Sequence, residues 1–309
     1  MSDRFRLTGL IAAPFTPFHV DGSLNPDAID PMTKLLIESG VTGVFVCGST
    51  GEGHSLSVAE RTMSAERWMK AVHGRMPVLL HVGHNSLSEA RTLAAHAASI
   101  GASAIAVVAP SYYKPKSVDD LIDFMAPVAA SAPALPLYYY NIPSMTGVSL
   151  PVPQILEKGK KRIPTLNGVK FSHSDLQELQ ECLALDGGAF DVVFGFDEML
   201  LAGLALGCRG AVGCTYNFAA PLYNRMIAAF DKGDLITARR EQLKSVELIR
   251  ALYDFGLLPA SKALMGMLGI DCGPVRAPLK AFTKVQTRAL YERLKPMDIF
   301  ARPLRLSEG

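Results

Sequence analysis

Short apolar runs alternate with segments of helical spacing along the chain as far as residue 214. Each run is apolar on both faces, which is typical of buried strands in a parallel sheet. We predict strands at 10–14, 44–47, 78–82, 104–108, 137–140, 168–171, 192–195 and 211–214. Helix starts are expected where Ser57 precedes Glu60, Ser86 precedes Glu89, and Ser174 precedes Asp175 and Glu178.

Eight strands in series with intervening helices place the chain in the α/β class and favour a closed (β/α)8 TIM barrel over an open sheet. The pattern then changes, because residues 221–294 show helical spacing only, with breaks at Gly233, 255–259 and 271–278. We therefore predict a barrel over residues 1–220 and a C-terminal helical extension over residues 221–309 that packs on it.

Composition agrees with this fold and limits the kinds of molecule that the protein is expected to bind. The 309 residues suit one barrel with an appendage, and 49% apolar residues supply a large core. Lys and Arg total 31 against 29 Asp and Glu, and neither sign forms a block that would bind nucleic acid or a membrane surface. We expect the partner to be a small molecule.

The chain shows no membrane or secretion signal. No apolar stretch reaches the ~20 residues of a membrane span, and none of signal-peptide length follows residues 1–8. The five cysteines, of which none forms a CxxC pair, argue against a disulfide framework and a zinc site. We expect a cytoplasmic protein.

Polar residues gather where the predicted strands end. In a TIM barrel the catalytic groups lie at the C-terminal ends of the strands and in the loops that follow. These positions hold residues 48–53, Ser111, Tyr112, Tyr113, Tyr139, Tyr140, Asn141, Lys170, Asp197, Glu198 and residues 215–217. We predict that one mouth of the barrel collects them.

Lys170 stands near the end of the sixth predicted strand. A free lysine with a pKa of ~10.4 is neutral in only about one molecule per few thousand at pH 7, and only the neutral amine attacks a ketone. Burial in a barrel mouth favours the neutral amine. From its position alone, an exposed strand-end lysine is an equally good interpretation.

The Gly-Ser-Thr-Gly-Glu-Gly turn at 48–53 suits a small anion. Glycine lets backbone N–H groups turn inward, and the hydroxyls of Ser49 and Thr50 add donors that fit the carboxylate of a 2-oxo acid. Ordinary loop chemistry explains the same residues. The spacing is neither that of a dinucleotide fingerprint nor that of a P-loop.

Three further sets of residues are candidates for chemistry. A phenol at Tyr140 suits proton transfer beside an imine, or it is a strand aromatic. Asp197 and Glu198 either bind sugar hydroxyls or cap the next helix. His81 and His84 lack a third ligand and an HExxH motif, so we predict no metal site there.

Four motifs carry a resemblance along almost the whole chain. Residues 48–53, 139–143, 168–171, and 210–213 leading into 215–217 look like the signature of the dihydrodipicolinate synthase and N-acetylneuraminate lyase superfamily. The resemblance implies a (β/α)8 barrel with a helical extension, usually a homotetramer. It also implies a class I aldolase that needs no cofactor and forms a lysine Schiff base with pyruvate.

The lyase branch of the superfamily is the more similar one. Residues 138–148 resemble that branch, and residues 195–198 match its pattern, in which an acid pair binds sugar hydroxyls. Met145 stands where synthases carry an Arg that grips a second carboxylate. The resemblance implies reversible cleavage of N-acetylneuraminate to pyruvate and N-acetylmannosamine.

The resemblance also implies roles for single residues. Lys170 forms the imine, and Tyr140 shuttles the proton. Ser49, Thr50 and Gly51 bind the carboxylate. The residues expected near the sugar or its proton relay are Ser172, Gly195, Asp197, Glu198, Cys214 and Tyr112.

Cys214 is a departure from the lyase pattern, which commonly has Ser there. A thiol is a weaker hydrogen-bond partner, and one neutral hydrogen bond is worth ~0.5–1.5 kcal/mol. The alternatives are therefore an aldolase or dehydratase of 2-keto-3-deoxy sugar acids and, less favoured, 4-hydroxy-tetrahydrodipicolinate synthase. A non-catalytic carbohydrate-binding relative is a further alternative, because fold alone does not settle function.

Overall fold

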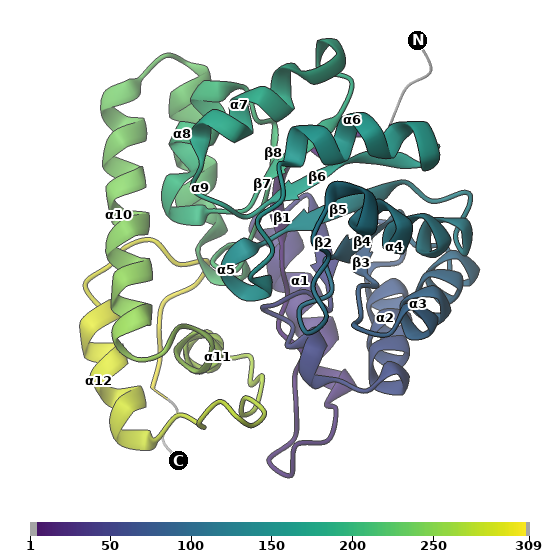
Figure 1. Ribbon diagram of the computed structural model, residues 1–309. Helices are drawn as coiled ribbons and strands as arrows, with labels where there is room; N and C mark the ends of the chain where they lie inside the picture. Colours follow the sequence, from purple (N-terminus) through teal and green to yellow (C-terminus); the bar gives the residue numbers. More distant parts are fainter. Residues whose placement is uncertain (1–4, 307–309) are drawn as a thin grey trace.

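All eight predicted strands form, and they close into one barrel (Figure 1). The computed structural model describes residues 5–306. The strands are β1 Gly9–Ala12, β2 Gly43–Val46, β3 Val78–His81, β4 Ala104–Val108, β5 Leu137–Asn141, β6 Leu166–Phe171, β7 Asp191–Phe194 and β8 Gly210–Gly213. Every neighbouring pair is parallel, and β8 returns to β1, which confirms the predicted TIM barrel.

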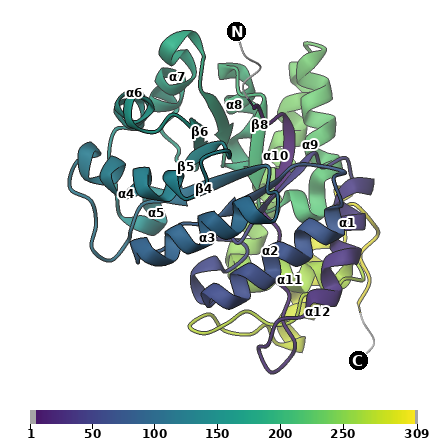
Figure 2. The same cartoon turned by 90° about the vertical axis from the view of Figure 1, so that its right-hand side faces the viewer.

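Helices follow the strands; those before residue 232 surround the barrel, and the later ones gather on one side of it (Figure 1 and Figure 2). They are α1 Ile29–Glu38, α2 Val58–Val72, α3 Leu87–Ser99, α4 Val118–Ala130, α5 Pro143–Thr146, α6 Val152–Arg162, α7 Leu176–Ala184, α8 Leu200–Leu206, α9 Tyr216–Asp231, α10 Leu235–Asp254, α11 Leu257–Met267 and α12 Lys284–Leu294. Short 3-10 turns lie at Pro26–Ala28, Gly53–Ser55, Leu185–Gly187 and Asp197–Met199. Within residues 5–306, no helix is both long and apolar enough to cross a membrane.

Side-chain caps fix where several of these helices begin. Ser57 forms a reciprocal capping box with Glu60 at α2, and the Ser86 hydroxyl accepts from a first-turn amide of α3, as predicted. At α7 the predicted Ser174 start is wrong by one residue. The cap is Asp175, whose carboxylate accepts from the Glu178 amide at 2.9 Å.

Strand register decides which side chains enter the barrel. Tyr138 pairs with Gly168, and Tyr140 pairs with Lys170. Because alternate residues of a strand share a face, these inward positions form one interior set. The interior is filled by the side chains of Leu7, Ile11, Ala13, Phe45, Leu79, Ala104, Ala106, Val108, Tyr138, Tyr140, Val193 and Val212.

The helices after β8 pack against one another and against the barrel. Helix α9 contacts α1 and β1 and completes the ring around the barrel, while α10 packs along α9 and also contacts α11 and α12. This confirms a helical C-terminal region (Figure 1). The predicted boundary at residue 220 falls inside α9, and the division into a barrel and an extension stays a prediction.

Candidate active site

Lys170 is buried inside the barrel. It lies on β6, and only 4% of its surface is exposed. Its Nζ lies 3.8 Å from the centroid of the Tyr140 ring and 4.1 Å from that of Phe45. The alternative of an exposed strand-end lysine is therefore wrong, because the register of β6 points this side chain inward.

Tyr140 joins Lys170 to the turn after β2. The two residues are register partners on neighbouring strands, and the Tyr140 hydroxyl lies 3.1 Å from Ser49 Oγ in a hydrogen bond. The Tyr140 ring packs edge-on against Phe45 and His81, with centroids 5.4 Å and 5.7 Å away. An amine, a phenol and an alcohol are thus contiguous at one mouth of the barrel, as acid–base chemistry at an imine requires.

The turn at 48–53 has a conformation that its sequence alone did not reveal. Cys47 and Glu52 both adopt positive φ, at 58° and 52°, which is uncommon for residues other than glycine. At Gly53, a Cβ would lie 1.9 Å from the Cys47 carbonyl oxygen, so only glycine fits. The backbone therefore folds back tightly over the end of β2.

This folding leaves hydrogen-bond donors free. Within residues 5–306, the backbone amides of Ser49, Thr50 and Gly51 donate no hydrogen bond. The Gly51 carbonyl accepts from the Thr16 hydroxyl at 2.6 Å, which anchors the turn from below. Consecutive unpaired amides together with two hydroxyls are a fitting site for a carboxylate.

Asp197 follows β7 and is held by the end of β8. Its Oδ2 accepts from the Thr215 amide at 2.8 Å and from the Thr215 hydroxyl at 2.6 Å. Gly213 is required beside it, since a Cβ there would lie 2.0 Å from Asp197 Oδ1. Burial raises the pKa of the Asp197 carboxyl, although its Thr215 hydrogen bonds and the Lys170 charge act in the opposite direction.

Glu198 is less enclosed than Asp197. Its side chain is half-buried, and burial followed by the charge of Asp197 raises the pKa of its carboxyl. Both acids belong to the 3-10 turn Asp197–Met199, but no side-chain capping hydrogen bond forms there or at the start of α8, so the helix-cap interpretation is not confirmed. Their binding of sugar hydroxyls stays a prediction.

Ser172 and Gly195 pack against each other at the ends of β6 and β7. The Ser172 amide donates to the Asn141 carbonyl, and the Gly195 amide donates to the Phe171 carbonyl, both at 2.8 Å. A Cβ at Gly195 would lie 2.0 Å from Ser172 Oγ. Glycine therefore lets the two loops approach beside Lys170.

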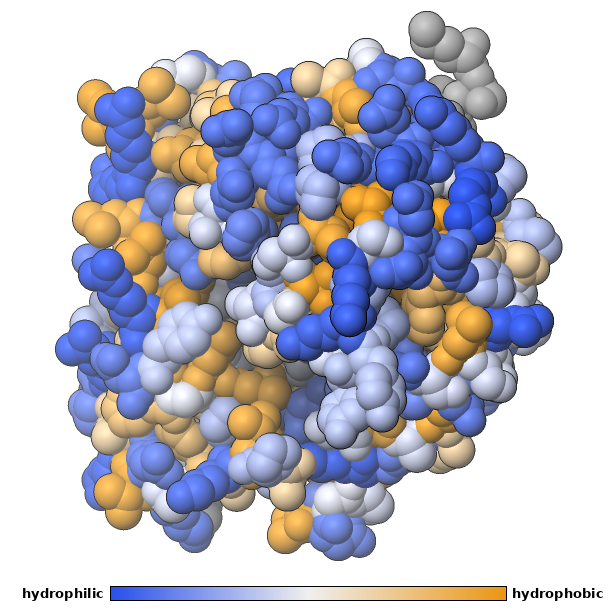
Figure 3. Space-filling view, in the orientation of Figure 1, coloured by the Kyte–Doolittle hydropathy of each residue, from blue (hydrophilic) through white to orange (hydrophobic). Residues whose placement is uncertain are grey.

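A cavity of about 940 Å³ opens over this mouth. Figure 3 shows a recess on this face between the barrel and the helical region that includes α11. The predicted residues that line the cavity are Ser49, Thr50, Tyr140 and Cys214. The predicted residues outside its lining are Lys170, which lies beneath the Tyr140 ring, and Gly51, Ser172, Gly195, Asp197, Glu198 and Tyr112.

The opposite wall of the cavity comes from the C-terminal region. It includes Tyr253, residues 255–259 and residues 279–283, and it is largely apolar. Met145, which is 71% exposed, also faces the cavity. The barrel motifs gave no sign of this wall; only the break in helical spacing at 255–259 marked one segment of it.

Cys214 lines the cavity as a neutral thiol. Burial, followed by the charge of Asp197, raises the pKa of Cys214 to about 12, while hydrogen bonds with Thr50 and Ser261 act in the opposite direction. It therefore presents a weak hydrogen-bonding group and not a thiolate.

Tyr112 lies away from the cavity in this chain. It is 77% exposed, and its ring stacks edge-on against Tyr113 with centroids 5.0 Å apart. Ser111, its neighbour in sequence, does line the cavity. A proton-relay role for Tyr112 stays a prediction.

The histidines at the end of β3 do not converge. His81 is buried, its Nδ1 lies 3.0 Å from the Cys47 carbonyl oxygen, and burial lowers the pKa of its imidazole well below the usual range. His84 Nδ1 instead accepts from the Ser86 amide at 2.9 Å.

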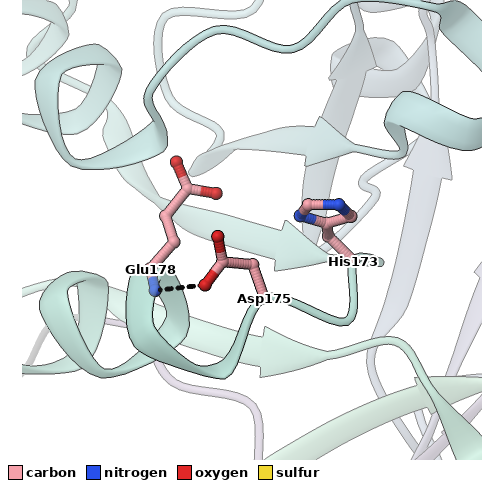
Figure 4. A group of neighbouring side chains, drawn as sticks. All are labelled: His173, Asp175 and Glu178. Atoms are coloured by element: carbon pink, nitrogen blue, oxygen red, sulfur yellow. Dashed lines mark hydrogen bonds between the residues drawn. The ribbon is translucent and has the colours of Figure 1, made fainter.

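Among residues 5–306, one group brings possible metal-ligand atoms together. His173, Asp175 and Glu178 each place one such atom within 4.8 Å of the others (Figure 4). Both carboxylates already have structural partners. Asp175 caps α7, and Glu178 Oε1 accepts from the Val152 amide of α6 at 2.8 Å.

A protein-family model matches almost the whole chain. The model described as the dihydrodipicolinate synthetase family covers residues 6–297. Among curated proteins, the N-acetylneuraminate lyase of Gallus gallus is 44% identical over 284 residues, which are 90% of this chain and 92% of that protein. The human enzyme of the same name is 40% identical over 301 residues, covering 96% and 94% of the two chains.

Solved structures show the same similarity. The N-acetylneuraminate lyase of Proteus mirabilis superposes with a TM-score of 0.93 at 42% identity, covering 96% of this chain and 100% of that one. A dihydrodipicolinate synthase from Aquifex aeolicus gives a TM-score of 0.88 at 28% identity, covering 97% and 100%.

Proposed function

Since this chain belongs to the dihydrodipicolinate synthetase family, we propose that it is a class I aldolase that reversibly cleaves N-acetylneuraminate to pyruvate and N-acetylmannosamine. Its relatives at 40–44% identity carry the name of that lyase. The observation that carries the mechanism is the burial of Lys170 between the Tyr140 and Phe45 rings, beneath a turn rich in free donors.

The reaction begins at Lys170. Its neutral amine attacks C2 of the open-chain substrate, and loss of water gives a protonated imine. The C3–C4 bond then breaks, and its electron pair moves into the imine to form an enamine. N-acetylmannosamine leaves, the enamine is protonated at C3, and hydrolysis releases pyruvate and the free lysine.

Tyr140 manages the proton of this cleavage. The C4 hydroxyl must lose a proton as the bond breaks, and the Tyr140 phenol relays it, passing its own proton to the substrate carboxylate as it takes up the one from C4. The hydrogen bond to Ser49 holds the phenol next to the turn that binds this carboxylate. The amides and hydroxyls of Ser49 and Thr50, with the Gly51 amide, would fix the carboxylate and orient C2 toward Lys170.

The sugar end of the substrate extends from Lys170 toward the ends of β7 and β8. Asp197 and Glu198 would accept hydrogen bonds from its hydroxyls, next to Ser172 and Gly195. Cys214 would face the far end of the chain, where a thiol gives less polar recognition than a hydroxyl. The thiol at Cys214 is the observation that favours the second candidate, a pyruvate-dependent aldolase or dehydratase of 2-keto-3-deoxy sugar acids.

We also propose that the protein is a cytoplasmic homotetramer that works without a cofactor. The family resemblance supports the homotetramer and the lack of a cofactor, and the cytoplasmic location is carried over from the expectation drawn from the sequence. Size-exclusion chromatography with light scattering tests the assembly state.

A panel of candidate acids tests the substrate. Pyruvate release is measured for N-acetylneuraminate and for a series of 2-keto-3-deoxy sugar acids, with the same enzyme preparation. We expect release from N-acetylneuraminate. Release confined to a deoxy sugar acid would establish the aldolase of the second candidate, and consumption of a deoxy sugar acid without pyruvate release would establish the dehydratase. Sugar binding without any turnover would indicate a non-catalytic binding protein.

A further inference from the structure

Glu52 is a buried acid in the turn that carries Ser49 and Thr50. Its side chain is 2% exposed, and both of its carboxylate oxygens are engaged by the C-terminal region. Oε1 lies 2.7 Å from Lys262 Nζ, and Oε2 accepts from the Arg276 amide at 2.8 Å. Glu52 therefore connects the barrel side of the cavity with its opposite wall.

Its partners belong to segments that form this opposite wall. Lys262 lies on α11, whose first residues line the cavity, and its side chain is 2% exposed. Its ammonium also donates to the Pro274 carbonyl at 2.9 Å and lies 4.3 Å from the centroid of the Phe18 ring. The Arg276 guanidinium in turn pairs with Glu60 at the start of α2.

Stability alone does not explain this arrangement. Burying an ion pair costs desolvation that the mutual attraction often only offsets, so such a pair is weak support for a stabilising role. Glu52 also holds a left-handed backbone, with φ 52° and ψ 30°, which costs of order 1–3 kcal/mol in a residue other than glycine. Glu52, two positions after Thr50, thus combines a buried charge with a strained backbone. The contacts of this residue fix the position of the turn.

We infer that Glu52 is a positioning residue, and that its contacts with Lys262 and Arg276 hold the 48–53 turn where its free amides meet the substrate carboxylate. The inference rests on the proposed Schiff-base function. A loosened turn would lose its grip on the carboxylate while the buried amine of Lys170 stays in place. The defect should therefore depend on whether the ketone carries a negative charge.

The experiment compares two ketones on the full-length protein. Trapping with cyanoborohydride is followed by mass spectrometry at Lys170, using pyruvate and its neutral ester methyl pyruvate, for the wild type, Glu52→Gln and Lys262→Met. We expect the pyruvate rate of both variants to fall about tenfold or more, the scale of a misplaced binding group. The methyl pyruvate rate should stay near that of the wild type.

The matched control is Glu241→Gln. Glu241 is equally buried, at 3% exposure, and pairs with Arg225 and Lys244 away from the cavity. Its loss should lower thermal stability but leave the ratio of the two trapping rates unchanged. Glu52→Gln preserves side-chain size and one acceptor oxygen, so it decides the question if Lys262→Met does not fold.

Each remaining outcome has one meaning. An unchanged ratio in Glu52→Gln, or an equal fall of both rates, would overturn the positioning role and leave the proposed function standing. A wild type that forms no adduct with either ketone would overturn the proposed function, and this inference with it.

Discussion

Replacing Tyr140 with phenylalanine separates proton transfer from imine formation. The substitution removes the hydroxyl that hydrogen-bonds Ser49 Oγ at 3.1 Å and keeps the ring that covers Lys170 at 3.8 Å. General acid–base groups contribute about 10²–10⁴-fold to rate, so kcat for N-acetylneuraminate cleavage should fall by that factor. This corresponds to about 3–5 kcal/mol of transition-state stabilisation.

The effect on stability should be much smaller. One hydrogen bond is lost without a cavity, which costs about 0.5–1.5 kcal/mol in the free energy of unfolding. The assays are pyruvate release in steady state, trapping of the pyruvate imine, and urea unfolding. The variant should still form the imine at Lys170.

The control is Tyr139→Phe on the same strand. Tyr139 is 1% exposed and faces the surrounding helices, whereas Tyr140 faces the interior. The control should keep wild-type kcat. Wild-type kcat in Tyr140→Phe, or equal losses in both variants, would refute the assignment of the proton to Tyr140.

Three further predictions concern other parts of the molecule. Gly195→Ala places a Cβ 2.0 Å from Ser172 Oγ, so thermal melts should show a loss of about 1–3 kcal/mol, and activity should fall. The Arg276 hydrogen bond lowers the pKa of Glu60 to about 2. This pair should therefore stabilise the fold above the unfolded pKa of ~4.3, and its contribution should be lost as the pH falls toward 2. Urea unfolding of the wild type and of Glu60→Gln over this pH range measures the contribution. Cys214→Ser should lower KM for N-acetylneuraminate about threefold to tenfold, since a hydroxyl restores one neutral hydrogen bond.

Each of these three predictions has an outcome that would contradict it. Gly266→Ala, where nothing lies within 4 Å of the added Cβ, is the control for Gly195, and equal melts for the two variants would remove the packing argument. A stability difference between wild type and Glu60→Gln that does not shrink in acid would contradict the pKa assignment. An unchanged KM in Cys214→Ser would place the thiol away from the substrate.

The strands were predictable because buried parallel strands are apolar on both faces. The runs at 44–47 and 104–108, for example, lie within a residue of β2 and β4. The direction of Lys170 was not predictable, since apolar runs carry no alternation that marks the interior face. Only the register of β6 on β5 settles it.

The C-terminal wall of the cavity escaped prediction for a different reason. Glu52 and Lys262 meet through tertiary packing between elements far apart in the chain, and neither residue has a sequence pattern that indicates the other. The exposure of Tyr112 is of the same kind, because Ser111, Tyr112 and Tyr113 follow one another in the loop after β4 and, of these, only Ser111 lines the cavity.

The most direct test of the account is borohydride reduction with pyruvate, followed by mass spectrometry of the lysine peptides. The chain supplies an internal control, because Lys262 is as buried as Lys170, at 3% against 4% exposure, but is paired with Glu52. The account predicts a reduced pyruvyl adduct at Lys170 and none at Lys262. Absence of the adduct at Lys170, or an adduct at Lys262 in its place, would contradict it.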